Sequence, residues 1–322
     1  MKKVIIGIHG LGIKPPKNIL KKWWIQSITD GLKATGCRNT AFTFELAYWA
    51  DVIHKESLDI NVTDEKNRLY VKRPYVRPGN IRIDNRPPKL NRTILHRLER
   101  GIDKIFFEDH IFVRLDAITN VIMRRLFRDL DAYFHAENSP DSGMDRSSKE
   151  IIHERLAELL RKNRKKEILL ISHSMGTVVA YDVLLKTKDC DVSMFVTMGS
   201  PLGIPVLMKK MAAKDDLNKD KIIATPECIT WKWYNFADID DNVAINSDLA
   251  SNYRENSKGV SPFDITVKNT YEYKGKRHPH KSFGYLRTPQ MARAVSEFLY
   301  SGKTGIFNVL SRVFPHEQGH SR

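Results

Sequence analysis

The residues best suited to chemistry form the run SHSMG at positions 172–176, where Ser174 separates an apolar segment from a helical pattern. A serine hydroxyl is a poor nucleophile at neutral pH. It needs a general base, a group that orients the base, and donors for the developing oxyanion. A tight strand-to-helix turn meets part of this need, because it projects the hydroxyl beside the N–H groups of the helix N-terminus.

The run differs at one position from the G-x-S-x-G pattern of such turns. The residues two before and two after the serine must be small, and here they are Ser172 and Gly176. Serine is nearly as small as glycine, so we expect the turn to survive. The alternative is that Ser174 only caps the start of a helix, and five residues alone do not decide between the two.

Candidates for the acid and the base come later in the chain. Asp238, Asp240 and Asp241 follow the apolar segment ITWKWYNF, while His278 and His280 precede KSFGYL. In a Ser-His-Asp triad the histidine takes the serine proton, and the aspartate holds the imidazole in the correct tautomer.

The elements that must position these residues alternate between strand and helix patterns. The alternation predicts an α/β fold with a mostly parallel sheet covered by helices on both faces. The expected strands are KVIIGI, TAFTFELAYWA, EILLIS, VSMFVTM, ITWKWYNF and FDITVKNTYEY, and the expected helices cover about 17–36, about 149–162, GTVVAYDVLLK and TPQMARAVSEFLY.

One region breaks the alternation. We expect residues 1–50 and 141–302 to form the core, residues 51–140 an inserted cap or lid, and residues 303–322 a loose tail. The insertion begins with a proline-containing basic loop and continues with a long helical pattern. The apolar residues on one face of that pattern are Ile111, Leu115, Ile118, Ile122, Leu126 and Leu130.

The charge of the chain is +15, and it is unevenly distributed. Residues 66–100 contain eleven Lys or Arg and two acids, a local excess of nine. Such a stretch favours contact with an anionic membrane surface, and the alternative is a solvated face. We expect no nucleic acid among the partners.

Three features predict a cytoplasmic protein, peripheral at the membrane if the basic stretch binds lipid. No apolar run approaches the roughly 18 residues of a membrane span. The apolar part of MKKVIIGIHG is too short for a secretory signal. The three cysteines, Cys37, Cys190 and Cys228, are far apart and have no metal-type spacing.

Five segments, in order, resemble those of α/β-hydrolases of the lipase and esterase kind. They are IHGLG for the oxyanion loop, ISHSMGT for the nucleophile turn, TMGSPLG, WYNFADIDDNVA for the acid loop and HPHKSFGYLRTP for the histidine loop. The likeness spans Met1 to about Tyr300 and omits residues 51–140. It implies the α/β-hydrolase fold with a helical cap. It also implies hydrolysis of carboxylic esters through an acyl-enzyme, without a cofactor.

By that resemblance Ser174 is the nucleophile, and the backbone N–H groups of Leu11 and Met175 form the oxyanion hole. Serine, acid and histidine occur in the chain order of this fold.

The resemblance also ranks the acid and base candidates. The acid of the family precedes a small residue and a valine, which selects Asp241 and leaves Asp238 in reserve. The family's histidine comes just before the closing helical segments, which selects His280 over His278.

Two other functions compete. The glycines after the first strand could belong to a nucleotide-binding domain, but their spacing is G-x-x-G-x-G, and no acid ends the second strand. The other alternative is a non-catalytic polyanion- or lipid-binding protein on a hydrolase scaffold. A metal site is not expected, because no carboxylate or cysteine completes a ligand set around the segment HPH.

Overall fold

The computed structural model describes residues 1–37, 40–79, 147–204, 207–208, 223–244 and 248–301. The amphipathic pattern predicted within the insertion, most of the basic stretch 66–100 and the predicted tail lie outside these ranges. Among the residues described, no helix is both long and apolar enough to cross a membrane.

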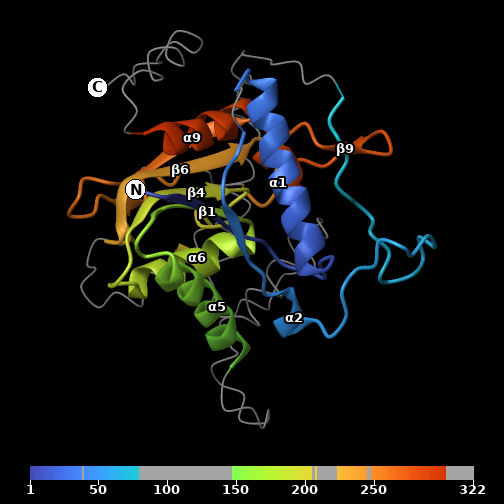
Figure 1. Ribbon diagram of the computed structural model, residues 1–322, viewed down its shortest axis with the longest axis horizontal. Helices are drawn as coiled ribbons and strands as arrows, with labels where there is room; N and C mark the ends of the chain where they lie inside the picture. The colour runs from blue at the N-terminus through green and yellow to red at the C-terminus, as the bar shows by residue number, and fades with distance from the viewer. Residues whose placement is uncertain (38–39, 80–146, 205–206, 209–222, 245–247, 302–322) are drawn as a thin grey trace, which may run out of the picture.

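Six strands form one all-parallel sheet, which confirms the predicted α/β class (Figure 1). β1, β3 and β4 are mostly apolar and are buried along nearly their whole length, because both faces of the sheet are covered. In sheet order the strands are β2 (Phe44–Ala47), β1 (Lys3–Ile8), β3 (Glu167–His173), β4 (Val192–Met198), β6 (Ile229–Asp238) and β8 (Pro262–Val267).

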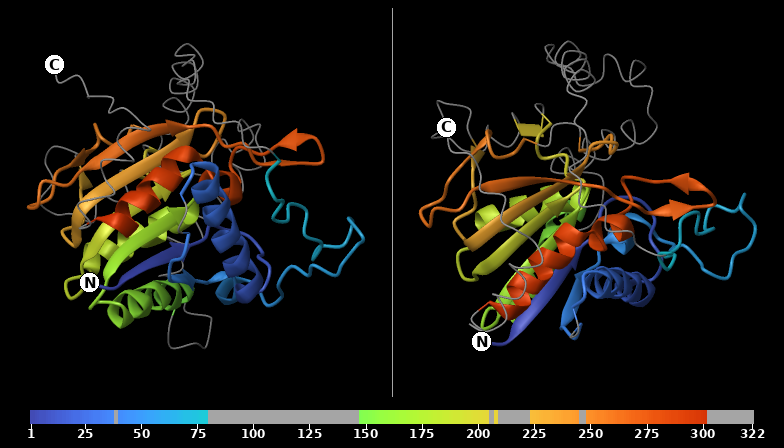
Figure 2. Two further views of the ribbon diagram at one scale, coloured as in Figure 1. Left: turned by 45° about the horizontal axis from the view of Figure 1, so that its top comes forward. Right: turned by 90° about the horizontal axis from the view of Figure 1, so that it is seen from above.

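Helices pack on both faces of the sheet (Figures 1 and 2). One face carries α1 (Lys17–Ala34), α8 (Ser282–Leu286) and α9 (Pro289–Tyr300). The opposite face carries α5 (Ser148–Lys162) and α6 (Met175–Lys186), with the short α2 (Ala50–Ile53) beside α5. Two apolar clusters, one on each side, therefore form the core.

Local signals explain where two of these helices begin. A capping box joins Ser147 and Glu150 at the start of α5, so two backbone donors that lack helical partners are satisfied. Thr288 accepts from the Met291 N–H at the start of α9, and Pro289 occupies the first turn.

The strand predicted over FDITVKNTYEY is wrong in its second half. β8 ends at Val267, and the chain then bends into a separate hairpin of β9 (Glu272–Tyr273) and β10 (Lys276–Arg277). Lys274 and Gly275 make its turn with φ of 52° and 71°, which suits a two-residue hairpin loop. A second small pair joins β5 (Ile223–Ala224) to β7 (Tyr253–Arg254).

The described part of the predicted insertion is fastened to the core near α1 and α8. The Tyr75 hydroxyl donates to Asp30 of α1. The Tyr271 hydroxyl donates to the carbonyl of Pro74 at 2.6 Å, and the Arg287 guanidinium donates to the carbonyl of Val76 at 3.0 Å.

The carboxyl ends of the parallel strands meet at one edge of the sheet. Ser172 of β3 is in register with Ile8 of β1 and with Thr197 of β4. The loops that follow β1, β3, β4 and β6 consequently lie together, which is where open α/β sheets bind their ligands.

Candidate active site

Ser174 occupies a strained turn between β3 and α6. Its φ of 55° and ψ of −131° are unusual for a residue with a side chain. The conformation is held by a bond from the Ser174 N–H to the Met198 carbonyl (3.1 Å) and by the Thr177 N–H and hydroxyl, which donate to the Ser174 carbonyl. The Ser174 side chain makes no capping hydrogen bond to α6, so the helix-cap alternative does not describe this hydroxyl.

The small neighbours of Ser174 are required by close backbone approaches. A Cβ on Gly176 would lie 2.6 Å from the His9 carbonyl oxygen, and one on Gly10 would lie 2.7 Å from Ser174 Cβ. Ser172 fits where the pattern has glycine because its buried hydroxyl donates to the Val196 carbonyl of β4 at 2.9 Å.

The structure brings Ser174, His280 and Asp241 into one hydrogen-bonded chain. His280 Nε2 lies 2.9 Å from Ser174 Oγ, and His280 Nδ1 lies 2.9 Å from both carboxylate oxygens of Asp241. The carboxylate only accepts, so Nδ1 carries a proton. Nε2 of the neutral ring is then free to accept from the serine hydroxyl.

The Asp241 carboxylate is fully buried, yet it is held in its ionised form. Burial would raise the pKa of Asp241, but the nearby His280, the Tyr285 hydroxyl and the Val243 N–H together lower it below its usual value. The Tyr285 hydroxyl donates to Asp241 Oδ2 at 2.7 Å, and the Val243 N–H donates to Oδ1 at 3.0 Å. Burial, followed by the charge of Asp241, raises the pKa of Tyr285, which keeps this donor protonated.

The reserve acid, Asp238, has different partners. Its carboxylate pairs with the Arg277 guanidinium and accepts from the backbone N–H groups of Asn269 and Asp240. The more exposed Asp240 also pairs with Arg277. These contacts join the end of β6 to the β9–β10 hairpin and leave Asp241 as the acid beside His280.

The alternative base, His278, points elsewhere. Its N–H donates to the Tyr271 carbonyl at 2.9 Å, and its ring lies 6.2 Å from the Tyr271 ring. Within the described residues no hydrogen bond connects the His278 ring to Ser174 or Asp241.

Two further histidines support the site, and only the structure shows their contacts. His173 Nε2 lies 2.9 Å from the His280 carbonyl, with ring centroids 4.9 Å apart. Burial, followed by the charge of His280, lowers the pKa of His173 well below its usual value, so the ring is neutral at pH 7.

His9 braces the glycine loop that follows β1. Its Nε2 accepts from the Trp49 N–H at 3.1 Å, and its Nδ1 therefore donates to the Gly10 carbonyl at 2.8 Å. The His9 carbonyl accepts from the Trp49 indole at 2.9 Å, and the two rings stack. Burial is the main reason that the pKa of His9 falls to about 3.

The two predicted oxyanion donors lie on segments that border Ser174. Met175 is the first residue of α6, so its N–H has no acceptor inside the helix. Leu11 follows Gly10, whose backbone comes close enough to Ser174 to exclude a Cβ.

Gly199, which follows β4, limits the other side of the site. It has a φ of 55°, and a Cβ there would lie 2.8 Å from Asp241 Oδ2 and 3.2 Å from His280 Nδ1. A larger residue would push against the two groups whose alignment the hydrogen-bonded chain needs.

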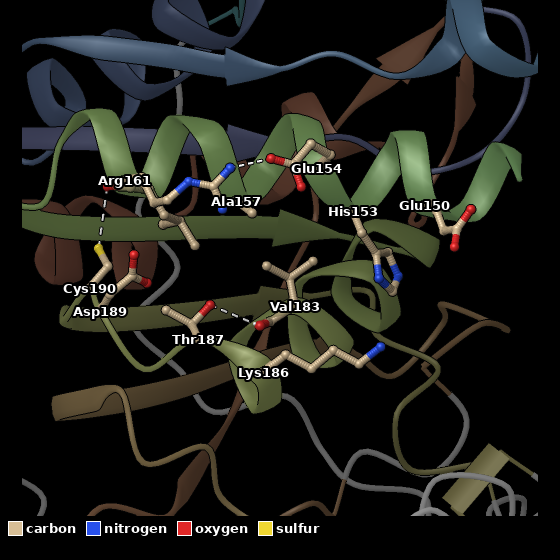
Figure 3. Close-up of a pocket in the computed structure, with 11 residues that line it drawn as sticks. Glu150, His153, Glu154, Ala157, Arg161, Val183, Lys186, Thr187, Asp189 and Cys190 are labelled. Carbon is tan, nitrogen blue, oxygen red and sulfur yellow. Dashed lines mark hydrogen bonds and ion pairs between the residues drawn. The ribbon is translucent and has the colours of Figure 1, made fainter. Parts of the chain in front are cut away.

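A separate cavity of about 370 Å³ lies between α5 and α6 (Figure 3). Its lining includes His153 and Arg161 of α5 and Val183 and Lys186 of the last turn of α6. None of Ser174, His280 and Asp241 lines it. Neither in this cavity nor in the rest of the described ranges is a group of three or more His, Cys, Asp or Glu side chains arranged to hold a metal ion.

Comparison with known proteins identifies no family: no protein-family model matches the chain, and no curated protein sequence is significantly similar to it. The family suggested by the sequence motifs is therefore not independently identified. What is shown is a protein of the α/β class with a six-stranded parallel sheet, at whose carboxyl edge a serine, a histidine and an aspartate are joined by hydrogen bonds.

Proposed function

We propose that this protein is a serine hydrolase of carboxylic esters with an α/β-hydrolase fold. The observation that carries the proposal is the hydrogen-bonded chain from Ser174 Oγ through the His280 ring to the buried Asp241 carboxylate. The strained turn at Ser174 supports it, because residues held in rare backbone conformations concentrate at functional sites.

In the first half-reaction, Ser174 Oγ attacks the ester carbonyl carbon while His280 Nε2 takes the hydroxyl proton. The carbonyl oxygen becomes an oxyanion, and we assign its binding to the Met175 and Leu11 N–H groups. As the tetrahedral intermediate collapses, the bond to the alkoxy oxygen breaks. The imidazolium returns its proton to the leaving alcohol, and the acyl group stays on Ser174.

In the second half-reaction a water molecule attacks the acyl-enzyme. His280 takes a proton from the water, and collapse of the second intermediate releases the carboxylic acid and restores the Ser174 hydroxyl. Asp241 stays ionised throughout and stabilises the imidazolium. These steps use the chain's own side chains and backbone N–H groups, together with water.

Labelling with a fluorophosphonate tests the nucleophile directly. We expect a single adduct on the wild-type protein, shown by intact mass, and none on Ser174→Ala. Hydrolysis of short acyl esters by Ser174→Ala should fall by several orders of magnitude, on the order of 10³ or more, because members of a triad act as a unit.

Ser172→Gly is the matched control, since it removes a hydroxyl from the same run and restores the G-x-S-x-G pattern. It should still be labelled, at a cost of roughly 0.5–1 kcal/mol in unfolding free energy for glycine in a strand. If a folded Ser174→Ala protein were labelled like the wild type, the proposed nucleophile would be wrong. A wild-type protein that neither reacts nor hydrolyses any ester would favour the non-catalytic binding protein.

A further inference from the structure

Three cationic side chains belong to loops near the Ser174–His280 pair and close to one another. Lys281 directly follows His280, and its Nζ lies 4.7 Å from the centre of the Phe283 ring. The Lys14 ammonium donates to the Leu11 carbonyl, on the loop beside Ser174. The third is Arg73, which precedes Pro74, the residue whose carbonyl accepts from Tyr271.

These charges act on one another and on the site. Burial is the main cause that lowers the pKa of Lys281 to about 7, and the charges of Lys14 and Arg73 lower it further. Lys14 and Lys281 also contribute to the low pKa of His173, whose ring lies against that of His280. Lys281, the residue that follows His280, is therefore a partly buried amine close to two other positive charges.

The acids of this neighbourhood have other partners. Asp241 is bound to His280 and Tyr285, while Asp238 and Asp240 pair with Arg277. In the described part of the chain, no carboxylate forms an ion pair with Lys281 or Arg73. Lys281 is partly buried, and a partly buried cation without a counter-charge is unfavourable, so an anionic ligand would supply that charge.

We propose that Lys281, Lys14 and Arg73 form a subsite for an anionic group of the ester substrate, a carboxylate or a phosphate a few atoms from the scissile bond. This inference rests on the proposed function, since it places the subsite beside the proposed nucleophile. It narrows the substrate class from esters in general to esters that carry a negative charge.

Two pairs of esters, matched in size and leaving group, test the subsite. Mono-para-nitrophenyl adipate against para-nitrophenyl hexanoate places the charge on the acyl side. Para-carboxyphenyl acetate against para-acetylphenyl acetate places it on the alcohol side. In at least one pair, we expect kcat/KM for the anionic ester to exceed that of its neutral partner by roughly tenfold or more, as for a charged hydrogen bond.

Substitution of Lys281 identifies the residues responsible. Lys281→Met keeps the apolar stem over Phe283 and removes the charge, so the anionic-to-neutral ratio should fall by about tenfold, whereas Lys281→Arg should preserve it. Lys186→Gln, an exposed residue at the far end of α6, should leave the ratio unchanged. A wild-type ratio near one in both pairs, or an equal loss for both esters in Lys281→Met, would overturn the subsite.

Calorimetry with Ser174→Ala separates this inference from the proposed function. In Ser174→Ala the esters stay uncleaved, and we expect the anionic ester to bind more tightly than its neutral partner. Loss of this difference in the double variant Ser174→Ala, Lys281→Met supports the subsite even if the wild-type protein hydrolyses nothing. If hydrolysis depends on Ser174 but shows no preference for anionic esters, the proposed hydrolase function stands and the anionic subsite is rejected.

Discussion

Asp238 and Asp241 are both buried at the end of β6, but their hydrogen-bond partners give them different roles. Asp241 receives hydrogen bonds from His280, Tyr285 and Val243, so it can orient and stabilise an imidazolium. Asp238 is paired with Arg277 and holds the β9–β10 hairpin. The difference comes from the partners rather than from the carboxylates themselves.

Exchanging each acid for its amide should separate these roles. Asp241→Asn is expected to lower kcat by roughly 10³–10⁴, because an amide favours the wrong histidine tautomer. Asp238→Asn should keep most of its activity but lose about 1–3 kcal/mol of unfolding free energy, since Arg277 is partly exposed and can recover water. Ester kinetics and urea denaturation measure the two effects, and a reversed ranking in kcat would transfer the acid role to Asp238.

Tyr285 positions Asp241 through a hydrogen bond from its hydroxyl. Its hydroxyl donates to Asp241 and accepts from the Asp238 N–H at 3.0 Å, so one phenol connects both acids. Tyr285→Phe removes only the oxygen, and we expect kcat to fall by about tenfold with little change in KM. An unchanged kcat in a folded variant would show that the Val243 N–H and His280 position Asp241 without it.

At the scale of elements, the site depends on how closely the loop after β1 approaches the turn after β3. His9 controls this approach, because its ring joins the Gly10 carbonyl to the Trp49 N–H, which comes just before α2. Only a neutral ring makes both bonds at once, since a protonated Nε2 can no longer accept from the Trp49 N–H.

This requirement makes stability depend on pH. The pKa of His9 is about 3 in the folded protein and about 6.5 when solvated, so between these values the unfolded chain binds more protons. Stability therefore rises with pH in this window and falls on acidification below about pH 6.5, by up to ~1.4 kcal/mol per pH unit. Urea denaturation of the wild type at pH 7, 6 and 5 should show the fall.

His9→Gln is the comparison, because an amide can accept from Trp49 and donate to Gly10 without titrating. Its stability should depend on pH less steeply than that of the wild type, with His173 still contributing part of the slope. Equal slopes in the two proteins would mean that His9 is not buried as a neutral ring.

At the scale of the whole molecule, the dominant property is the charge of +15. Part of the basic stretch lies in the described segment 66–79, where Lys66, Lys72 and Arg77 are exposed. We propose that the stretch 66–100 contacts an anionic membrane surface, where each cation contributes about 1 kcal/mol and salt screens the attraction.

Co-sedimentation with vesicles tests this proposal. Binding to anionic but not neutral vesicles at low salt is expected, weakened at least tenfold in the triple variant Lys66→Gln, Lys72→Gln, Arg77→Gln. Arg73 is left in place so that the proposed substrate subsite is unaltered. A second triple variant, in which the exposed Lys2, Lys186 and Lys188 are replaced by Gln, controls for net charge. If both triple variants weakened vesicle binding equally, the effect would be a non-specific one of net charge and the proposed contact would be rejected.

The sequence by itself determined the α/β class, because the alternation of apolar strands and amphipathic helices is a local pattern that the two-sided burial of a parallel sheet requires. It also singled out Ser174 with its small neighbours. Family resemblance then selected Asp241 and His280, the pair that the structure places beside Ser174. The hairpin at Lys274 and Gly275 was not predicted, because Thr270, Tyr271 and Tyr273 favour strands and were read as a continuation of the strand that ends at Val267.

Only the tertiary structure decided the contacts between distant residues. His280 lies 106 residues from Ser174 in the chain, and Tyr285 lies 44 from Asp241, so no local pattern could report either bond. The supporting roles of Tyr285, His173 and His9 depend on hydrogen-bond partners supplied by other elements. The convergence of Lys14, Arg73 and Lys281 has the same origin, since three cations far apart in the chain share one electrostatic environment only after the loops at the sheet edge have folded together.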